Sequence, residues 1–261
     1  LWELIAGQIE PEAVYFRPPE WYAARGIQVH LGARVTALDT AEHRLGLADG
    51  SNVRYDRLLL ATGARPFVPP LVGSDKAGVF RLRTLDDALA IRRQARSVST
   101  AVVIGGGLLG LETARALLTA GLKVTVIEFA PYLLQRQLDA EGAQVLQSLL
   151  EAQGLRLLTD AASEAILGHE RATGVRFKDG RVVSGELVLT STGIRSRVEL
   201  AQEAGLEANR GVVVDGQLCA SASDVYAAGD VVTDLHQLSV ATGHAAMATK
   251  KFIRKTHKEI R

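Results

Sequence analysis

Cysteine is nearly absent from this sequence, and its charge is almost balanced. The single cysteine, Cys219, can form no disulfide within the chain, and neither a Cys-x-x-Cys pair nor a zinc-type spacing of cysteine and histidine occurs. Thirty Lys and Arg residues against 29 Asp and Glu residues give a net charge of +1, which supplies no overall field for nucleic acid or an anionic membrane. We therefore expect no metal site, no nucleic-acid or membrane partner, and a cytoplasmic location.

Long apolar runs are absent too. No run of 18 or more apolar residues occurs, and the opening LWELIAGQIEPE has acidic residues where a signal peptide needs positive charge. The first residue is Leu rather than Met, so we expect the natural protein to begin further upstream. The length of 261 residues and the 47% hydrophobic content fit one large or two modest globular domains.

The clearest motif is a G-x-G-x-x-G sequence that follows the apolar run Ala101–Ile104. The pattern predicts a buried parallel strand, a glycine turn and a helix that ends near Gly121. Gly105 permits the tight turn, Gly107 lets the backbone approach a pyrophosphate, and Gly110 lets the helix pack closely on the strand. The N–H groups at the start of the helix, those of Leu108 and Leu109, are then available to phosphates.

The next strand, KVTVIE, ends at Glu128, about 20 residues beyond the first glycine of the motif, where an acid reaches a ribose 2′-hydroxyl. Phe129, Ala130 and Pro131 follow, so a 2′-phosphate would meet negative charge and no arginine. The sequence thus predicts a site for NAD(H) rather than NADP(H). The alternative is an ordinary glycine-rich turn between a strand and a helix.

An internal repeat relates the two halves of the chain. Residues Ala48–Arg65 align without a gap on Lys178–Arg195, and Glu20–Leu38 align on Ser148–Ile166. Each copy predicts a helix end, a glycine stop, a strand, a small antiparallel excursion with an Asp-Gly turn, and a buried strand that ends in Thr-Gly. We interpret this as a duplicated dinucleotide-binding unit; two unrelated βαβ halves with similar turns are the alternative.

Four segments resemble the pyridine-nucleotide-dependent flavoprotein disulfide reductase superfamily. They are ATGARPFVPP (61–70), VVIGGGLLGLE (102–112), TSTGIRSR (190–197) and DVYAAGDVV (224–232). Two further segments, RPPEWYAARGI (17–27) and VIEFAPYLLQRQLDAEG (126–142), are most similar to the NADH/FAD module of nitrite reductase large subunits and to rubredoxin and ferredoxin reductases. The tail HQLSVATGHAAMA (236–248) looks more like thioredoxin reductase.

The resemblance implies an α/β protein with two doubly wound dinucleotide-binding domains, the NADH domain being inserted into an incomplete FAD domain. The implied boundaries are 1–78 and 198–261 for the FAD domain and 79–197 for the NADH domain. The FAD counterpart of the G-x-G-x-x-G unit would precede Leu1, so we expect an N-terminally truncated FAD domain that retains little FAD by itself.

The resemblance also assigns site residues. Ala61, Thr62 and Gly63 match the segment that passes the flavin, and Gly229 and Asp230 match the second FAD motif, in which the acid accepts hydrogen bonds from the ribityl chain. Glu112 matches an acid near the nicotinamide; a first-turn acid favoured by the helix dipole is the alternative. The complete cofactor-binding set comprises Ala61, Thr62, Gly63, Gly105, Gly107, Leu108, Leu109, Gly110, Glu112, Glu128, Gly193, Gly229 and Asp230.

The implied function is an NADH-dependent FAD oxidoreductase that passes electrons from NADH through flavin to an acceptor of the nitrite reductase, rubredoxin or ferredoxin type. The acceptor would be a protein or a domain, and the chain could form a homodimer. No catalytic side chain is assigned, because the cofactors carry the chemistry. The alternative is an NAD(H)-binding module without flavin turnover. We expect His244 and the basic end 250–261 to lie in helices, with a flavin contact as the alternative for His244.

Overall fold

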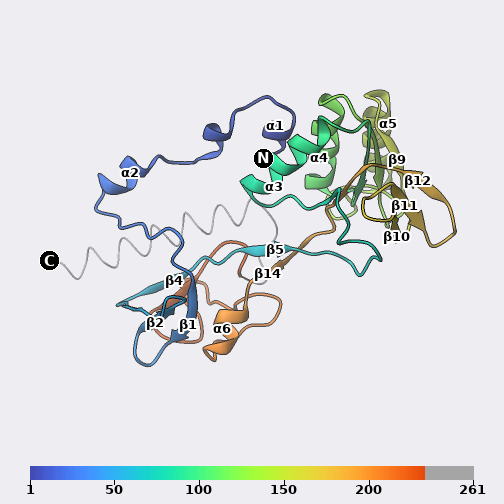
Figure 1. Ribbon diagram of the computed structural model, residues 1–261. Coiled ribbons are helices and arrows are strands. Elements are labelled where there is room, and N and C mark those ends of the chain that lie inside the picture. The colour runs from blue at the N-terminus through green and yellow to red at the C-terminus, as the bar shows by residue number, and fades with distance from the viewer. Residues whose placement is uncertain (233–261) are drawn as a thin grey trace. The chain divides into compact units, whose positions relative to one another are not determined.

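A computed structural model describes residues 1–232 (Figure 1). His244, the tail 236–248 and the basic end 250–261 lie outside the described residues. The chain forms two compact units. Unit 1 comprises Leu1–Pro19 and Pro66–Gly193; unit 2 comprises Glu20–Arg65 and the described residues from Ile194 to 232.

A five-stranded sheet, parallel throughout, is the centre of unit 1. Its strands, in spatial order, are β6 (Val79–Phe80), β13 (Leu187–Thr190), β7 (Thr100–Ile104), β8 (Lys123–Ile127) and β9 (Arg156–Leu158). Successive residues of a strand point to opposite faces, and both faces of this sheet are covered. Ala101 and Val103 of β7 pack in one apolar cluster, while Val102 and Ile104 pack in another.

Helices cover the first of these faces. They are α1 (Trp2–Ile5), α3 (Leu85–Ala95), α4 (Leu108–Thr119) and α5 (Ala140–Ala152). Thr84 and Asp87 begin α3 with a capping box, and Asp139 caps α5. Helix α1 lies against α3 and α4 (Figure 1). Its Leu4 and Ile5 side chains are buried in the apolar cluster that the three helices share. Burial of these two side chains accounts for the grouping of Leu1–Pro19 with unit 1.

A three-stranded antiparallel sheet covers the other face. It consists of β10 (Ser163–Leu167), β11 (Gly174–Phe177) and β12 (Val182–Ser184). Ile166, Val175 and Phe177 of this sheet pack in the same cluster as Val102 and Val188 of the parallel sheet. Unit 1 is therefore a layer of helices, a parallel sheet and a small antiparallel sheet.

Unit 2 has the same small sheet with a shorter parallel one. The antiparallel strands are β1 (Val35–Asp39), β2 (Arg44–Leu47) and β3 (Asn52–Arg54), and the parallel pair is β4 (Leu58–Leu60) with β15 (Val225–Ala227). Leu38, Leu60, Val212, Val225 and Ala227 form its core with residues around α6 (Glu199–Glu203). The remaining elements are η1 (Pro11–Val14), α2 (Pro19–Ala23), and a two-stranded sheet of β5 (Ala64–Pro66) and β14 (Ile194–Ser196).

The predicted antiparallel excursion forms in both copies of the repeat. The strand β1 shifts register between Val35 and Ala37, and β10 shifts between Ser163 and Ala165, the positions that the sequence alignment pairs. Gly50 and Gly180 follow the aligned aspartates and have the same φ of 85°. Such agreement in irregular features supports duplication over two unrelated halves.

One expectation differs from the structure. The strand predicted after Gly26 is not formed: Ile27 and Val29 lie in irregular, exposed backbone. Its counterpart β9 pairs with β8, and the described residues of unit 2 contain no strand in the place of β8, so this segment lacks a partner. The compact units divide the chain after residues 19, 65 and 193, so that residues 1–19 and 66–78 group with unit 1. The domain boundaries at 78 and 197 stay a prediction.

Helix α4 packs very closely against the turn that precedes it. A Cβ on Gly110 would overlap the carbonyl oxygen of Gly105, and Gly105 itself has a φ of 117°. Gly107, in contrast, has an ordinary φ of −76°, and a Cβ there would meet no atom within 4 Å.

We predict that Gly110→Ala lowers the free energy of unfolding by about 1–3 kcal/mol because the added methyl group forces α4 away from the turn. Gly107→Ala is the matched control and should change it by less than about 1 kcal/mol. Urea unfolding followed by circular dichroism measures both. Equal stability of the two variants would contradict this account of the packing.

Candidate nucleotide-binding site

The predicted glycine turn and Glu128, the acid predicted to bind the ribose, lie close together at one edge of the sheet in unit 1. Strands β7 and β8 are parallel neighbours, so Gly105 and Glu128 both follow carboxyl ends at the same edge. The Gly106 N–H donates to Glu128 Oε2 at 2.6 Å, and the Ala130 N–H donates to Glu128 Oε1 at 2.8 Å. Open sheets of this kind bind ligands at the carboxyl edge.

At Gly107, neither the backbone conformation nor the packing of the chain requires a glycine. Its φ is ordinary and the space around a Cβ is empty, whereas Gly105 and Gly110 are required by the backbone. Gly107 is the N-cap of α4, and no side chain caps this helix end. Leu108 and Leu109, the first helical residues, are 49% and 41% exposed. Open space beside an uncapped helix N-terminus fits the close approach of a pyrophosphate.

Glu112 lies one turn into α4 and is half-buried. Burial raises the pKa of its carboxyl group above the ordinary value, because desolvation disfavours the charged form. The next residue, Thr113, is fully buried and donates from Oγ1 to the Leu109 carbonyl oxygen at 2.7 Å.

Gly193 follows β13, the neighbour of β7 on the side away from β8. It has a φ of 104° and no atom near a Cβ. The carbonyl oxygen of Ser191, in the same connection, faces Gly105 so closely that a Cβ on that glycine would overlap it. The segment therefore borders the glycine turn.

The other predicted residues gather at the carboxyl edge of the parallel pair in unit 2. Ala61–Gly63 follow β4, and Gly229 and Asp230 follow β15, its partner; the Ala228 N–H donates to the Leu60 carbonyl oxygen at 3.1 Å. Gly229 has a φ of 83° with open space around it. These five residues are close together, and they belong to a different unit from the glycine turn.

Side-chain hydroxyl groups fix the backbone around this second group. Thr62 Oγ1 donates to the Arg197 carbonyl oxygen at 3.0 Å, and Ser196 Oγ donates to the Asp230 carbonyl oxygen at 2.6 Å. The Arg197 N–H donates to the Gly63 carbonyl oxygen at 2.9 Å. The two strand ends are therefore held in place, with room at Gly229 for a ligand to approach.

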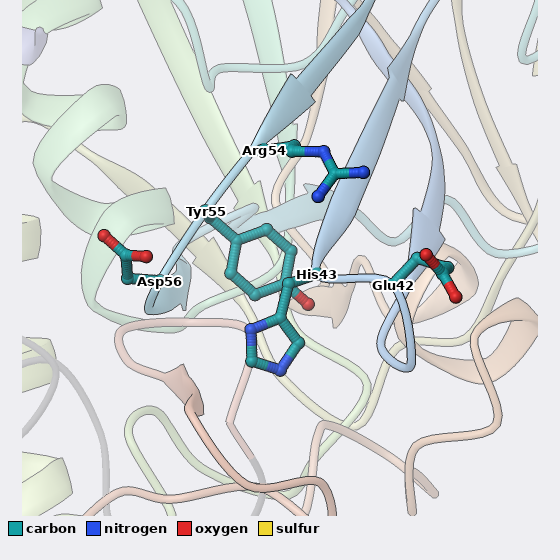
Figure 2. A pocket seen from close by; sticks show the side chains of 5 residues that line it. All are labelled: Glu42, His43, Arg54, Tyr55 and Asp56. Atoms are coloured by element: carbon teal, nitrogen blue, oxygen red, sulfur yellow. The ribbon is translucent and has the colours of Figure 1, made fainter.

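A separate open pocket of about 410 Å³ lies on the small antiparallel sheet of unit 2. It is lined by Glu42, His43, Arg54, Tyr55 and Asp56 (Figure 2). The His43 and Tyr55 rings stack with centroids 5.1 Å apart, and His43 has a left-handed φ of 48°. The pKa of the Tyr55 hydroxyl is raised by burial and by the nearby carboxylates of Asp39 and Asp224.

The repeat explains why this pocket exists. Tyr55 and Asp56 align with Gly185 and Glu186 of unit 1. There a Cβ on Gly185 would lie 2.6 Å from Val102 of β7, and Glu186 Oε2 accepts from the Ser99 N–H at 3.0 Å. Strand β7 thus covers the corresponding surface in unit 1. None of the predicted cofactor-binding residues lines the pocket, and we assign no ligand to it.

One exposed residue beside the first site was not among the predicted cofactor-binding residues. Phe129 follows Glu128 directly and is 75% exposed, whereas Ala130 and Leu133 in the same connection are buried. A large apolar residue directly after the ribose acid, where polar turn residues are usual, is the signal that points to it.

Residues 1–232 contain neither a candidate membrane span nor a candidate metal cluster. No helix there has the length and apolar character of a membrane span. No group of three or more His, Cys, Asp and Glu residues in the same part of the chain is arranged to hold a metal ion.

Comparisons with known proteins show which sequences and structures this chain is similar to. Nitrite reductase [NAD(P)H] of Bacillus subtilis is 38% identical over 229 residues, which are 87% of this chain and 28% of that protein. A ferredoxin reductase of known structure from Rhodopseudomonas palustris is 32% identical with a TM-score of 0.82, covering 85% of this chain and 55% of that one. An FAD-dependent pyridine nucleotide-disulphide oxidoreductase from Desulfovibrio vulgaris is 30% identical with a TM-score of 0.69, covering 77% and 53%.

The chain thus spans about a quarter to a half of the length of these relatives. The resemblance inferred from the sequence and the α/β class with parallel sheets are confirmed. The family model for pyridine nucleotide-disulphide oxidoreductases matches residues 6–248. The chain belongs to the pyridine nucleotide-disulphide oxidoreductase family.

Proposed function

We propose that the chain binds NADH at the glycine turn of unit 1 and FAD at the carboxyl edge of unit 2, and that it passes electrons from NADH to an acceptor. The observation that carries the proposal is the open space at Gly107, beside the uncapped start of α4 and next to Glu128. This combination matches what a dinucleotide needs: room for the pyrophosphate, N–H donors for it, and an acceptor for the ribose.

The residues of unit 1 have distinct roles in this proposal. The N–H groups of Leu108 and Leu109 bind the pyrophosphate, and the Glu128 carboxylate accepts hydrogen bonds from the adenosine ribose. Glu112, with its raised pKa, lies near the nicotinamide end. Gly193 leaves room for the dinucleotide beside the turn. Together these contacts bind and orient NADH; no side chain is needed to transfer a proton.

In unit 2, Ala61–Gly63 and Gly229 provide backbone that a flavin can approach closely, and the Asp230 carboxylate accepts hydrogen bonds from the ribityl hydroxyl groups. The open space at Gly229 and the adjacent ends of β4 and β15 fit such a group. FAD, when bound, supplies the chemistry of accepting a hydride and releasing electrons singly or in pairs. The acceptor is a protein or domain, as the nitrite reductase and ferredoxin reductase relatives suggest.

The second candidate is an NAD(H)-binding module without flavin turnover. It is favoured by a contrast within the described residues: unit 1 has a complete glycine turn, whereas the flavin residues of unit 2 come from two strand ends without one. A cytoplasmic location and a homodimer stay predictions.

We predict that NADH binds at least about tenfold more tightly than NADPH, a difference of about 1.4 kcal/mol, because Glu128 repels a 2′-phosphate. Glu128→Ala should bring the ratio of the two dissociation constants close to one. The ratio is the informative quantity, since Glu128 also accepts from the Gly106 and Ala130 N–H groups and its loss weakens the turn for both nucleotides. Fluorescence titration of both nucleotides measures it; equal affinities for the unaltered chain would overturn the assignment.

Gly107→Ala should weaken NADH binding by at least about tenfold, because its methyl group occupies the space that the pyrophosphate needs. Gly216→Ala is the matched control, since Gly216 in unit 2 also has open space around it and no positive φ. Calorimetric titration with NADH, with unfolding curves for both variants, separates binding from stability. Unchanged affinity in Gly107→Ala would place the nucleotide elsewhere.

With added FAD, we predict that NADH bleaches the flavin absorbance band under anaerobic conditions and that Asp230→Ala abolishes this bleaching. Asp56→Asn is the control, because Asp56 lies in the pocket of unit 2 and outside the proposed flavin site. If the chain binds NADH but never bleaches FAD, the second candidate function is correct.

A further inference from the structure

Phe129 is an exposed aromatic residue held on fixed backbone. The Glu128 N–H donates to the Leu158 carbonyl oxygen at 2.8 Å, and the Asp160 N–H donates to the Ala130 carbonyl oxygen at 2.9 Å. The Ala130 N–H donates to Glu128 Oε1. Both neighbours of Phe129 are therefore anchored to the end of β9 and the connection that follows it, yet Phe129 is 75% exposed. This position is not the tip of a loose loop.

The ring remains outside although apolar partners are close in sequence. Leu133, four residues further along, is 1% exposed and packs beside Gly106, where a Cβ would lie 2.6 Å from Leu133 Cδ2. Ala130 is also buried. An apolar side chain that is kept in water on rigid backbone at the ligand-binding edge of a sheet is suited to contact a ligand.

We propose that Phe129 binds the adenine ring of the dinucleotide by stacking. The inference rests on the proposed function, because it takes the adenosine ribose to lie against Glu128. Adenine is bonded directly to that ribose, so the base must lie within a few ångströms of the acid and of the residue after it. A base presents an apolar π-face, and an aromatic side chain is the usual partner for it.

The proposal makes Phe129 a determinant of affinity for the adenosine half of NADH. Stacking of a base on an aromatic side chain strengthens binding by roughly five- to 150-fold. A ligand that has adenosine and lacks nicotinamide should therefore depend on Phe129 as strongly as NADH does. ADP-ribose is such a ligand, and it also avoids any effect of the flavin or the acceptor.

Calorimetric titration of the 261-residue chain with ADP-ribose and with NADH tests the proposal. Phe129→Ala should weaken both ligands by the same factor, about tenfold. Phe129→Trp should restore the affinity, because the larger ring stacks on the base as well. Leu149→Ala is the control: Leu149 on α5 is also an exposed apolar residue, at 58%, and should leave both affinities unchanged.

Each other outcome decides against the proposal. If Phe129→Ala binds ADP-ribose as the unaltered chain does, the adenine lies elsewhere, while the proposed NADH site stands. If Phe129→Trp fails to restore a lost affinity, the contribution of Phe129 is not stacking. If the unaltered chain binds neither ligand, the proposed function fails and the role of Phe129 fails with it.

Discussion

The close approach of α4 to the end of β7 is the constraint on which the first site depends. A Cβ at Gly110 would overlap the Gly105 carbonyl oxygen, so the helix can begin directly above the strand end only if that residue has no side chain. This approach brings the uncapped N-terminus of α4 to the edge of the sheet. It also places the Gly106 N–H within reach of Glu128 from the neighbouring strand. The helix start, the turn and the acid are thus positioned by one steric condition.

The repeat shows how much of a dinucleotide-binding unit is set by backbone rather than by side chains. Both small antiparallel sheets have the same register shift and the same Asp-Gly turn, although few of their side chains agree. Where aligned side chains of the two copies differ, the residues that surround them differ as well. Gly185 allows Val102 to pack against it, whereas Tyr55 stacks on His43 at the wall of an open pocket. The backbone pattern is therefore shared, and the chemistry of the two surfaces is not.

Local patterns predicted most of the first site. The spacing of Gly105, Gly107 and Gly110 predicts one turn geometry, and the distance in sequence to Glu128 corresponds to one helix and one strand. The turn and the acid can therefore be predicted from a single segment. Contacts between distant segments could not be predicted in this way. A strand after Gly26 needs a neighbour that the local sequence does not specify, and the position of α1 depends on α3 and α4 far along the chain. The exposure of Phe129 likewise depends on hydrogen bonds from the connection after β9.

Glu128 links nucleotide choice to the integrity of the turn. An ionised carboxylate has about four acceptor positions. Two of them accept from the Gly106 and Ala130 N–H groups, and the other two are available for the proposed contacts to the ribose hydroxyl groups. An arginine at this position would suit a 2′-phosphate. Its guanidinium group has only donors, so it could not accept hydrogen bonds from the Gly106 and Ala130 N–H groups. Gly106 is buried, so its unpaired N–H would cost about 1–3 kcal/mol. A change of preference toward NADPH therefore requires a new acceptor for the turn as well as a new partner for the phosphate.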